Sequence, residues 1–334
     1  MVTRNSNGVR CERAVVAVLP RSADVRTRAD RSGGADLVVN GSSMRVVWAG
    51  DGQLGDVRRV LAGGLVADVV VARQLSPGAL AELARAGVGW VDETGAAEIS
   101  FGSIVVARSG RPVRREVPRR WTPSVLAVAE AALCGVRATA SVMREATGLS
   151  TGSCVNALRV LTDLELLEAA AGRGRGSARR VSDSDLLLRA YVSAAAALAE
   201  DLRLDVGVTW RDLVEGLGVA GKRWASQRVE WAVTGAVAAD ALAPYLTSVT
   251  SAEVYVSADT VLGLEAAAAA AGLKPVEGGR LVLRPFPTRS TDRLATRVGG
   301  LRVAPWPRVY ADLGHGGVRG EDAAEHLKEV VGGR

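Results

Sequence analysis

Arginine and glycine alternate in one short stretch of this chain, residues 172–180 (GRGRGSARR), which contains no acidic residue. Guanidinium groups bind phosphate oxygens, and glycine lets a loop bend and approach a partner closely. The stretch therefore predicts a phosphate-binding loop. Its candidate contacts are Arg173, Arg175, Arg179 and Arg180. A solvated arginine loop is the alternative, and the segment before the loop bears on that choice.

Three helices are predicted in front of this loop, in a region that starts at residue 121. Thr122, Thr139 and Ser150 each stand where an N-cap residue is expected, and Gly148 supplies the left-handed residue that ends the short second helix. Helix, short helix, tight turn and longer helix is the order of a helix-turn-helix. Two strands joined by the arginine loop follow, so residues 121–185 predict a winged helix-turn-helix.

The third of these helices carries the residues that would read DNA. Its apolar residues recur at helical spacing and predict one buried side. They are Val155, Leu158, Leu161 and Leu164. On the polar side, Asn156 suits adenine and Arg159 suits guanine in the major groove. Thr151 and Ser153, at the amino end, would donate to phosphates. An exposed polar face without a partner is the alternative for all four residues.

A second basic stretch, residues 108–120, contains six arginines, two prolines and one glutamate. Proline and a run of like charge predict a linker. Arg114 and Arg115 are its candidate DNA contacts. The whole chain of 334 residues has a formal net charge of +6, which suits an anionic partner.

The regions on both sides of the predicted winged helix alternate short valine-rich runs with helical stretches, which is typical of α/β domains. One helix is predicted to begin after Ser76 and to end at Gly87. The sequence thus predicts a multidomain α/β protein with a central winged helix. Its predicted divisions are 1–107, 108–120, 121–185 and 186–334.

Cysteine and histidine patterns argue against a metal site or a disulfide framework. The three cysteines have no paired spacing, and two histidines are too few for a histidine-based site. These residues are Cys11, Cys134, Cys154, His315 and His326. The amino terminus lacks a signal-peptide core, and no uncharged apolar run is long enough to cross a bilayer. We therefore expect a cytoplasmic protein with no membrane partner, associated with the nucleoid when bound to DNA.

Four carboxy-terminal segments carry a resemblance to a known family. They are WAVTGAVAADALAPY (231–245), EVYVS, VLRPF and VYADLGHGGVRGEDAAEHL (309–327). In order and spacing they resemble the AbiEi antitoxins of type IV toxin–antitoxin systems, in the larger form with an additional amino-terminal domain. The chain departs from that pattern at Trp306 and Pro307, where the family usually has a polar residue before the tyrosine.

This resemblance implies a transcriptional regulator without a cofactor. The chain would bind double-stranded DNA at its own promoter through residues 121–182 and repress it. Its carboxy-terminal domain would act against a cognate nucleotidyltransferase-like toxin.

The amino-terminal region resembles a restriction-endonuclease-like fold, including the segment GVGWVDETG at 87–95. Active members of that fold need an acid followed by a Glu-x-Lys pair on the next strand, to hold a metal ion and position water. Asp36 could be the first acid, but the residues at 48–50 are tryptophan, alanine and glycine. Asp51 and Asp56 follow without a lysine and are interpreted as solvated loop residues. We therefore predict a degenerate domain that binds no metal and has no catalytic residue.

Two other functions remain open at this point. One is a metal-dependent nuclease in DNA repair or defence, acting through the amino-terminal domain. The other is a DNA-binding protein without a toxin, associated with a plasmid or telomere. An adjacent nucleotidyltransferase gene would favour the antitoxin.

Overall fold

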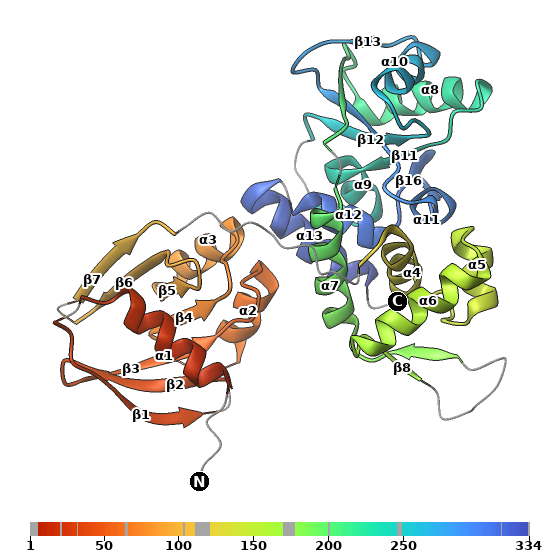
Figure 1. The fold of residues 1–334 in the computed structure, drawn as a ribbon. Helices are drawn as coiled ribbons and strands as arrows, with labels where there is room; N and C mark the ends of the chain where they lie inside the picture. Colours follow the sequence, from red (N-terminus) through yellow and green to blue (C-terminus); the bar gives the residue numbers. More distant parts are fainter. Residues whose placement is uncertain are drawn as a thin grey trace. The chain divides into compact units, whose positions relative to one another are not determined.

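The computed structural model describes ten stretches of the chain (Figure 1). They are residues 6–20, 22–31, 33–63, 66–102, 104–110, 121–169, 178–199, 201–245, 249–314 and 316–332. These stretches form a mixed α/β protein with two seven-stranded sheets, a two-stranded sheet and 13 helices, which confirms the predicted α/β character. None of the described helices is both long and apolar enough to span a membrane.

The chain separates into two compact units. Unit 1 comprises Met1–Arg114 with Gly317–Asp322, and unit 2 comprises Arg115–Gly316 with Ala323–Arg334. The finer division at residues 185 and 186 stays a prediction.

The sheet of unit 1 follows the order of the chain. Its strands are β1 (Val25–Arg31), β2 (Gly34–Val39), β3 (Ser42–Trp48), β4 (Val69–Ala72), β5 (Gly89–Asp92), β6 (Ala97–Phe101) and β7 (Ile104–Arg108). Strands β3, β4 and β5 are parallel, and the other pairs are antiparallel. Parallel neighbours need a crossover connection. Helices α2 (Leu54–Ala62) and α3 (Pro77–Ala86) supply the two crossovers.

Helices cover both faces of this sheet (Figure 1). Helix α1 (Ser6–Val18) packs on one face, where Val69 and Val71 of β4 join its core. Helices α2 and α3 pack on the other face, where Val70 and Ala72 lie. Successive side chains of a strand point to opposite faces, so β4 is apolar at every position because both of its faces are buried.

The predicted ends of one helix in this unit can be compared directly with the structure. Ser76 accepts the Ala79 N–H at 3.2 Å and Gly87 has a φ of 66°, so the predicted ends of α3 are confirmed. In the segment 87–95, Asp92 Oδ1 accepts the N–H of Thr94 at 3.0 Å and that of Ala96 at 3.1 Å. Asp92 therefore organises the turn between β5 and β6.

The large sheet of unit 2 has the order β13-β10-β14-β12-β11-β16-β15. Its strands are β10 (Leu204–Gly207), β11 (Trp231–Thr234), β12 (Ala252–Val256), β13 (Lys274–Pro275), β14 (Leu281–Pro285), β15 (Thr296–Val298) and β16 (Leu301–Val303). Strand β12 is parallel to β14, and β11 is parallel to β16. The accompanying helices are α8 (Leu213–Ser226), α9 (Gly235–Leu242), α10 (Val261–Ala270), α11 (Arg289–Arg293), α12 (Trp306–Leu313) and α13 (Gly317–Val331).

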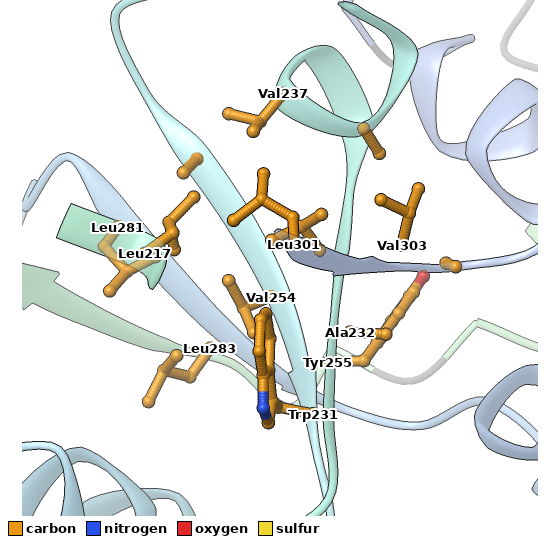
Figure 2. Close-up of a cluster of buried hydrophobic side chains, with 14 of the residues drawn as sticks. Leu217, Trp231, Ala232, Val237, Val254, Tyr255, Leu281, Leu283, Leu301 and Val303 are labelled. Atoms are coloured by element: carbon orange, nitrogen blue, oxygen red, sulfur yellow. The ribbon is translucent and has the colours of Figure 1, made fainter. Parts of the chain in front are cut away.

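Two tryptophans lie in the core of this sheet, and Trp231 belongs to the same buried cluster as Leu217, Val254 and Leu283 (Figure 2). The Trp224 indole is fully buried and donates its Nε1–H to the Ala267 carbonyl at 2.7 Å. Helix α8 approaches the Trp231 ring so closely that a Cβ on Gly221 would lie 2.1 Å from it. Both tryptophans are therefore core residues.

A helical region precedes this sheet in unit 2. It consists of α4 (Pro123–Leu133), α5 (Ala140–Thr147), α6 (Thr151–Asp163), β8 (Leu167–Ala169), β9 (Arg179–Val181) and α7 (Ser184–Ala197). The predicted N-caps are present, with Thr122, Thr139 and Ser150 accepting N–H groups at 3.3, 3.4 and 3.1 Å. Gly148 has a φ of 71° and ends α5. Strands β8 and β9 pair antiparallel, with Leu167 opposite Val181.

Candidate nucleic-acid interface

Helix α6 has one buried side, but it differs from the predicted one. Cys154, Ala157, Leu158 and Leu161 are buried, whereas Val155 is 49% exposed. The assignment of Val155 to the buried side is therefore wrong. The buried residues follow the i, i+3, i+4, i+7 spacing of a helical stripe. That stripe is visible in the sequence once the small Cys154 and Ala157 side chains are counted as apolar.

The opposite side of α6 presents the polar residues that the sequence selects. Thr151, Asn156 and Arg159 are exposed, and Ser153 is half-buried. The Arg159 guanidinium donates from Nη2 to Asn156 Oδ1 at 2.9 Å. This bond leaves the amide N–H groups of Asn156 and the other guanidinium donors of Arg159 on the same exposed surface. Such a surface can donate several hydrogen bonds in a defined direction.

The amino end of α6 is organised by hydroxyl groups. Ser150 Oγ accepts the Ser153 N–H at 3.1 Å and lies 2.9 Å from Ser153 Oγ. Thr151 is the first residue of the helix and is exposed. Backbone N–H groups at a helix amino end favour anions, so Thr151 lies where a phosphate contact is expected.

The four arginines of the loop differ in position. Arg173 and Arg175 lie outside the described residues. Arg179 is half-buried: its Nε–H donates to Thr162 Oγ1 at 3.0 Å and its backbone N–H donates to the Ala138 carbonyl at 3.1 Å. Arg179 therefore attaches β9 to α6. The Arg180 side chain is 83% exposed and forms an ion pair with Glu168 on β8 at 3.1 Å.

The linker arginines Arg114 and Arg115 also lie outside the described residues. Their contacts with DNA stay a prediction from sequence.

A buried carboxyl group holds α4 in place. The Glu130 side chain accepts the Tyr191 hydroxyl at 2.5 Å, the Ser290 hydroxyl at 2.8 Å and the Thr291 hydroxyl at 3.0 Å. Burial raises the pKa of Glu130, and the hydrogen bonds and the charge of Arg308 offset only part of that rise. Glu130 therefore joins α4 to α7 and α11. Sequence reasoning missed it, although an acid within the apolar run VLAVAEAAL is a signal.

The raised pKa of Glu130 gives a pH prediction. The native state holds the Glu130 proton more tightly than the unfolded chain, so this group makes the protein less stable as pH rises above the usual carboxyl pKa. Glu130→Gln removes the titration. We expect the free energy of unfolding of Glu130→Gln, relative to the parent protein, to increase between about pH 5 and about pH 8. Urea unfolding at the two pH values measures it, and a parallel change in both proteins contradicts the prediction.

A second buried acid lies on α12. Asp312 accepts the Arg308 Nε–H at 3.0 Å, a further bond from Arg308 Nη2, the Thr234 hydroxyl at 2.5 Å and the Tyr255 hydroxyl at 2.7 Å. Burial alone would raise the pKa of Asp312, but the Arg308 charge and these bonds lower it overall. Asp312 therefore ties α12 to β11 and β12 as a carboxylate.

The tyrosine of the same helix makes another tie. The Tyr310 hydroxyl donates to Glu325 Oε1 on α13 at 2.5 Å. Tyr310, Asp312 and Glu325 all belong to the segment that resembles the AbiEi antitoxins. Their side chains have structural partners within unit 2.

The three candidate acids of unit 1, Asp36, Asp51 and Asp56, each have a different basic partner. Asp36 faces Arg45 across β2 and β3, with 3.9 Å between charged atoms, and Asp51 pairs with Arg73 at 2.9 Å. Asp56 is 5% exposed and lies in the first turn of α2. Its interpretation as a solvated loop residue is therefore wrong, because it accepts the Gln53 N–H at 3.4 Å and forms an ion pair with Arg59.

No group of three or more His, Cys, Asp or Glu residues that could hold a metal ion occurs in the described stretches. His315 lies outside them, and the His326 ring stacks on Tyr245 with 4.7 Å between centroids. The prediction that unit 1 lacks catalysis stays a prediction.

Comparisons of the chain with protein-family models, with curated proteins and with solved structures found no match. The resemblance to the AbiEi antitoxins stays a prediction from the sequence. We therefore infer a function from the side chains themselves. The relevant features are the exposed side of α6 and the arginine-rich sequence of residues 172–180.

Proposed function

We propose that this chain is a sequence-specific double-stranded DNA-binding protein, with residues 121–182 as a winged helix-turn-helix. Helix α6 is the recognition helix, and the loop between β8 and β9 is the wing. The observation that carries the proposal is the hydrogen-bonded Asn156–Arg159 pair on the exposed side of α6. These side-chain types match the base edges of adenine and guanine in the major groove.

The size of α6 supports this role. It has 13 residues, which corresponds to about 20 Å of helix. A helix with side chains has a diameter of about 10–12 Å, and the major groove of B-DNA is about 12 Å wide. The buried stripe of Cys154, Ala157, Leu158 and Leu161 fixes which side of α6 is presented outward.

The two arginines of β9 have different roles in this proposal. Arg179 attaches β9 to α6 through Thr162, so it positions the wing relative to the recognition helix. Arg180 is exposed, and among the described residues its ion-pair partner is the exposed Glu168. Surface ion pairs of this kind contribute little stability. Its guanidinium can exchange Glu168 for a phosphate. Arg173 and Arg175 are the other phosphate contacts in this proposal.

The proposed role in the cell is repression of the chain's own promoter, together with neutralisation of a nucleotidyltransferase-like toxin. This part of the proposal is supported by the resemblance of residues 231–327 to the AbiEi antitoxins. Tyr310 and Asp312 have partners inside unit 2, so we expect a toxin to contact other, exposed residues. An adjacent nucleotidyltransferase gene whose product is toxic without this chain tests the role, and the absence of such a gene contradicts it.

The wing gives a test of the DNA-binding proposal. The slope of log affinity against log salt becomes shallower by about 0.9 for each phosphate that the protein no longer neutralises. We expect Arg173→Ala combined with Arg175→Ala to flatten the slope by about 2 and to weaken binding to all sequences alike. Fluorescence anisotropy over a series of salt concentrations measures the slope.

The matched control for this test is Arg297→Ala combined with Arg228→Ala, which removes the same charge from exposed positions elsewhere in unit 2. We expect the control to keep the parent slope. If the wing variant has the same slope as the control, the wing arginines do not contact DNA phosphates.

A further inference from the structure

Unit 2 contains a pocket of about 240 Å³ beside the first helix of the proposed DNA-binding region. Its walls come from α4, from the end of α7, from β12 and β14, and from α12. Most of the lining is apolar, with Leu126, Leu198, Leu202 and Phe286 as its larger side chains. Two arginines, Arg284 and Arg308, are its charged lining residues. None of the described residues that line it is acidic.

Arg284 has unused hydrogen-bonding capacity. Its Nε atom is buried and makes no hydrogen bond with any described residue. The nearest charged partner is Glu253, whose Oε2 lies 3.6 Å from that nitrogen, which is beyond hydrogen-bond distance. The Arg284 side chain as a whole is 32% exposed and lines the pocket, so its guanidinium group places a positive charge where an anion in the pocket can pair with it.

Arg308 adds positive charge to the same pocket. Its Nε and Nη2 atoms donate to Asp312, and in the described part of the chain its Nη1 atom makes no hydrogen bond. Guanidinium groups bind carboxylates through two parallel N–H donors. The pocket therefore combines an apolar wall with two guanidinium groups that retain donors.

We propose that this pocket is a binding site for a small organic carboxylate with an apolar body. Pockets that bind drug-sized ligands have volumes of about 300–1,000 Å³. This pocket, at about 240 Å³, is slightly smaller, so we expect a ligand smaller than a typical drug molecule. The carboxylate would bind at Arg284 and Arg308, and the apolar body would pack against Leu126, Leu198 and Phe286. Because α4 and α6 share one core, a bound carboxylate contacts the helix on which the recognition helix packs.

Calorimetric titration of the full chain tests this site in the absence of DNA, so its outcome does not depend on the proposed function. The probes are benzoate, phenylacetate and 4-methylpentanoate, each with its neutral amide as a matched control. We expect at least one carboxylate to bind and its amide to bind about tenfold or more weakly, because a charge-assisted hydrogen bond is lost. If none of the three carboxylates binds at a concentration of about 10 mM, so that every dissociation constant is above that value, the proposal is overturned.

Variants locate the binding. Arg284→Gln is expected to weaken carboxylate binding about tenfold or more. Leu202→Trp, which places a larger side chain in the pocket, is expected to abolish it. The exposed Arg297→Gln, on β15, is the charge-matched control and should bind as the parent does. Unchanged affinity in both pocket variants, or equal affinity for carboxylate and amide, overturns the proposal.

Discussion

Asp312→Ala is expected to lower the free energy of unfolding by about 3–5 kcal/mol, because it leaves a buried charge without its partner. Arg308 is 4% exposed and loses its only carboxylate partner in the described structure. The Thr234 and Tyr255 hydroxyls also lose the acceptor that joins α12 to the sheet. Urea unfolding followed by the fluorescence of the buried Trp224 and Trp231 measures the loss.

The control for this prediction is Glu277→Ala, which removes an exposed acid from the same unit. Surface substitutions of this kind change stability by about 0.5 kcal/mol or less. The combined variant Asp312→Ala with Arg308→Met removes the unpaired charge, and we expect it to recover part of the loss. A loss below about 1 kcal/mol for Asp312→Ala contradicts the described network.

Asn156→Ala and Arg159→Ala are each expected to reduce discrimination between a specific site and random duplex by about 1–3 kcal/mol, or roughly 5- to 150-fold. Base-edge contacts specify a sequence, whereas phosphate contacts position the protein on any sequence. Affinity for random duplex should therefore stay close to that of the parent. Fluorescence anisotropy with both duplexes at one salt concentration measures the ratio.

The two side chains are hydrogen-bonded, so their effects are not expected to add. A double-mutant cycle should give a coupling energy of about 0.5 kcal/mol or more, as for other residues in direct contact. Arg297→Ala controls for the loss of one positive charge. Equal losses on specific and random duplex would mean that Asn156 and Arg159 contact only the DNA backbone.

Local signals in the sequence were sufficient for many of the elements. The caps Thr122, Thr139 and Ser150 form as predicted, because an N-cap depends on residues two or three positions away. Strand β4 is one of the predicted valine-rich runs, and all of its residues are apolar because both faces of the sheet are covered at this strand.

Other elements were missed for physical reasons. Helix α8 contains Gly216, Gly218 and Gly221, which lower helix propensity. Two of these glycines are explained only by the tryptophan rings that pack against them. Strand β1 (VRTRADR) was missed because it lies at a sheet edge and is too charged to show an apolar alternation.

In the candidate site, too, contacts between neighbours in the sequence could be predicted, whereas contacts between distant residues could not. Asn156 and Arg159 are three residues apart, so their shared face follows from helical spacing. The partners of Glu130 are at least 61 residues away, so they become apparent only in the folded chain. Arg179 was assigned to phosphate from its place in an arginine-rich stretch, and its bond to Thr162 gives it a structural role as well.

Selection from a library of random DNA duplexes tests the central claim most directly. The purified full chain is incubated with the library at physiological salt, and the bound DNA is sequenced after several rounds. We predict that one sequence motif is enriched and binds about 10³-fold or more tightly than unselected duplex, and that this preference is lost in Asn156→Ala combined with Arg159→Ala. Bound DNA that shows no enriched motif, or a motif that the double variant selects equally well, would contradict sequence-specific recognition by α6.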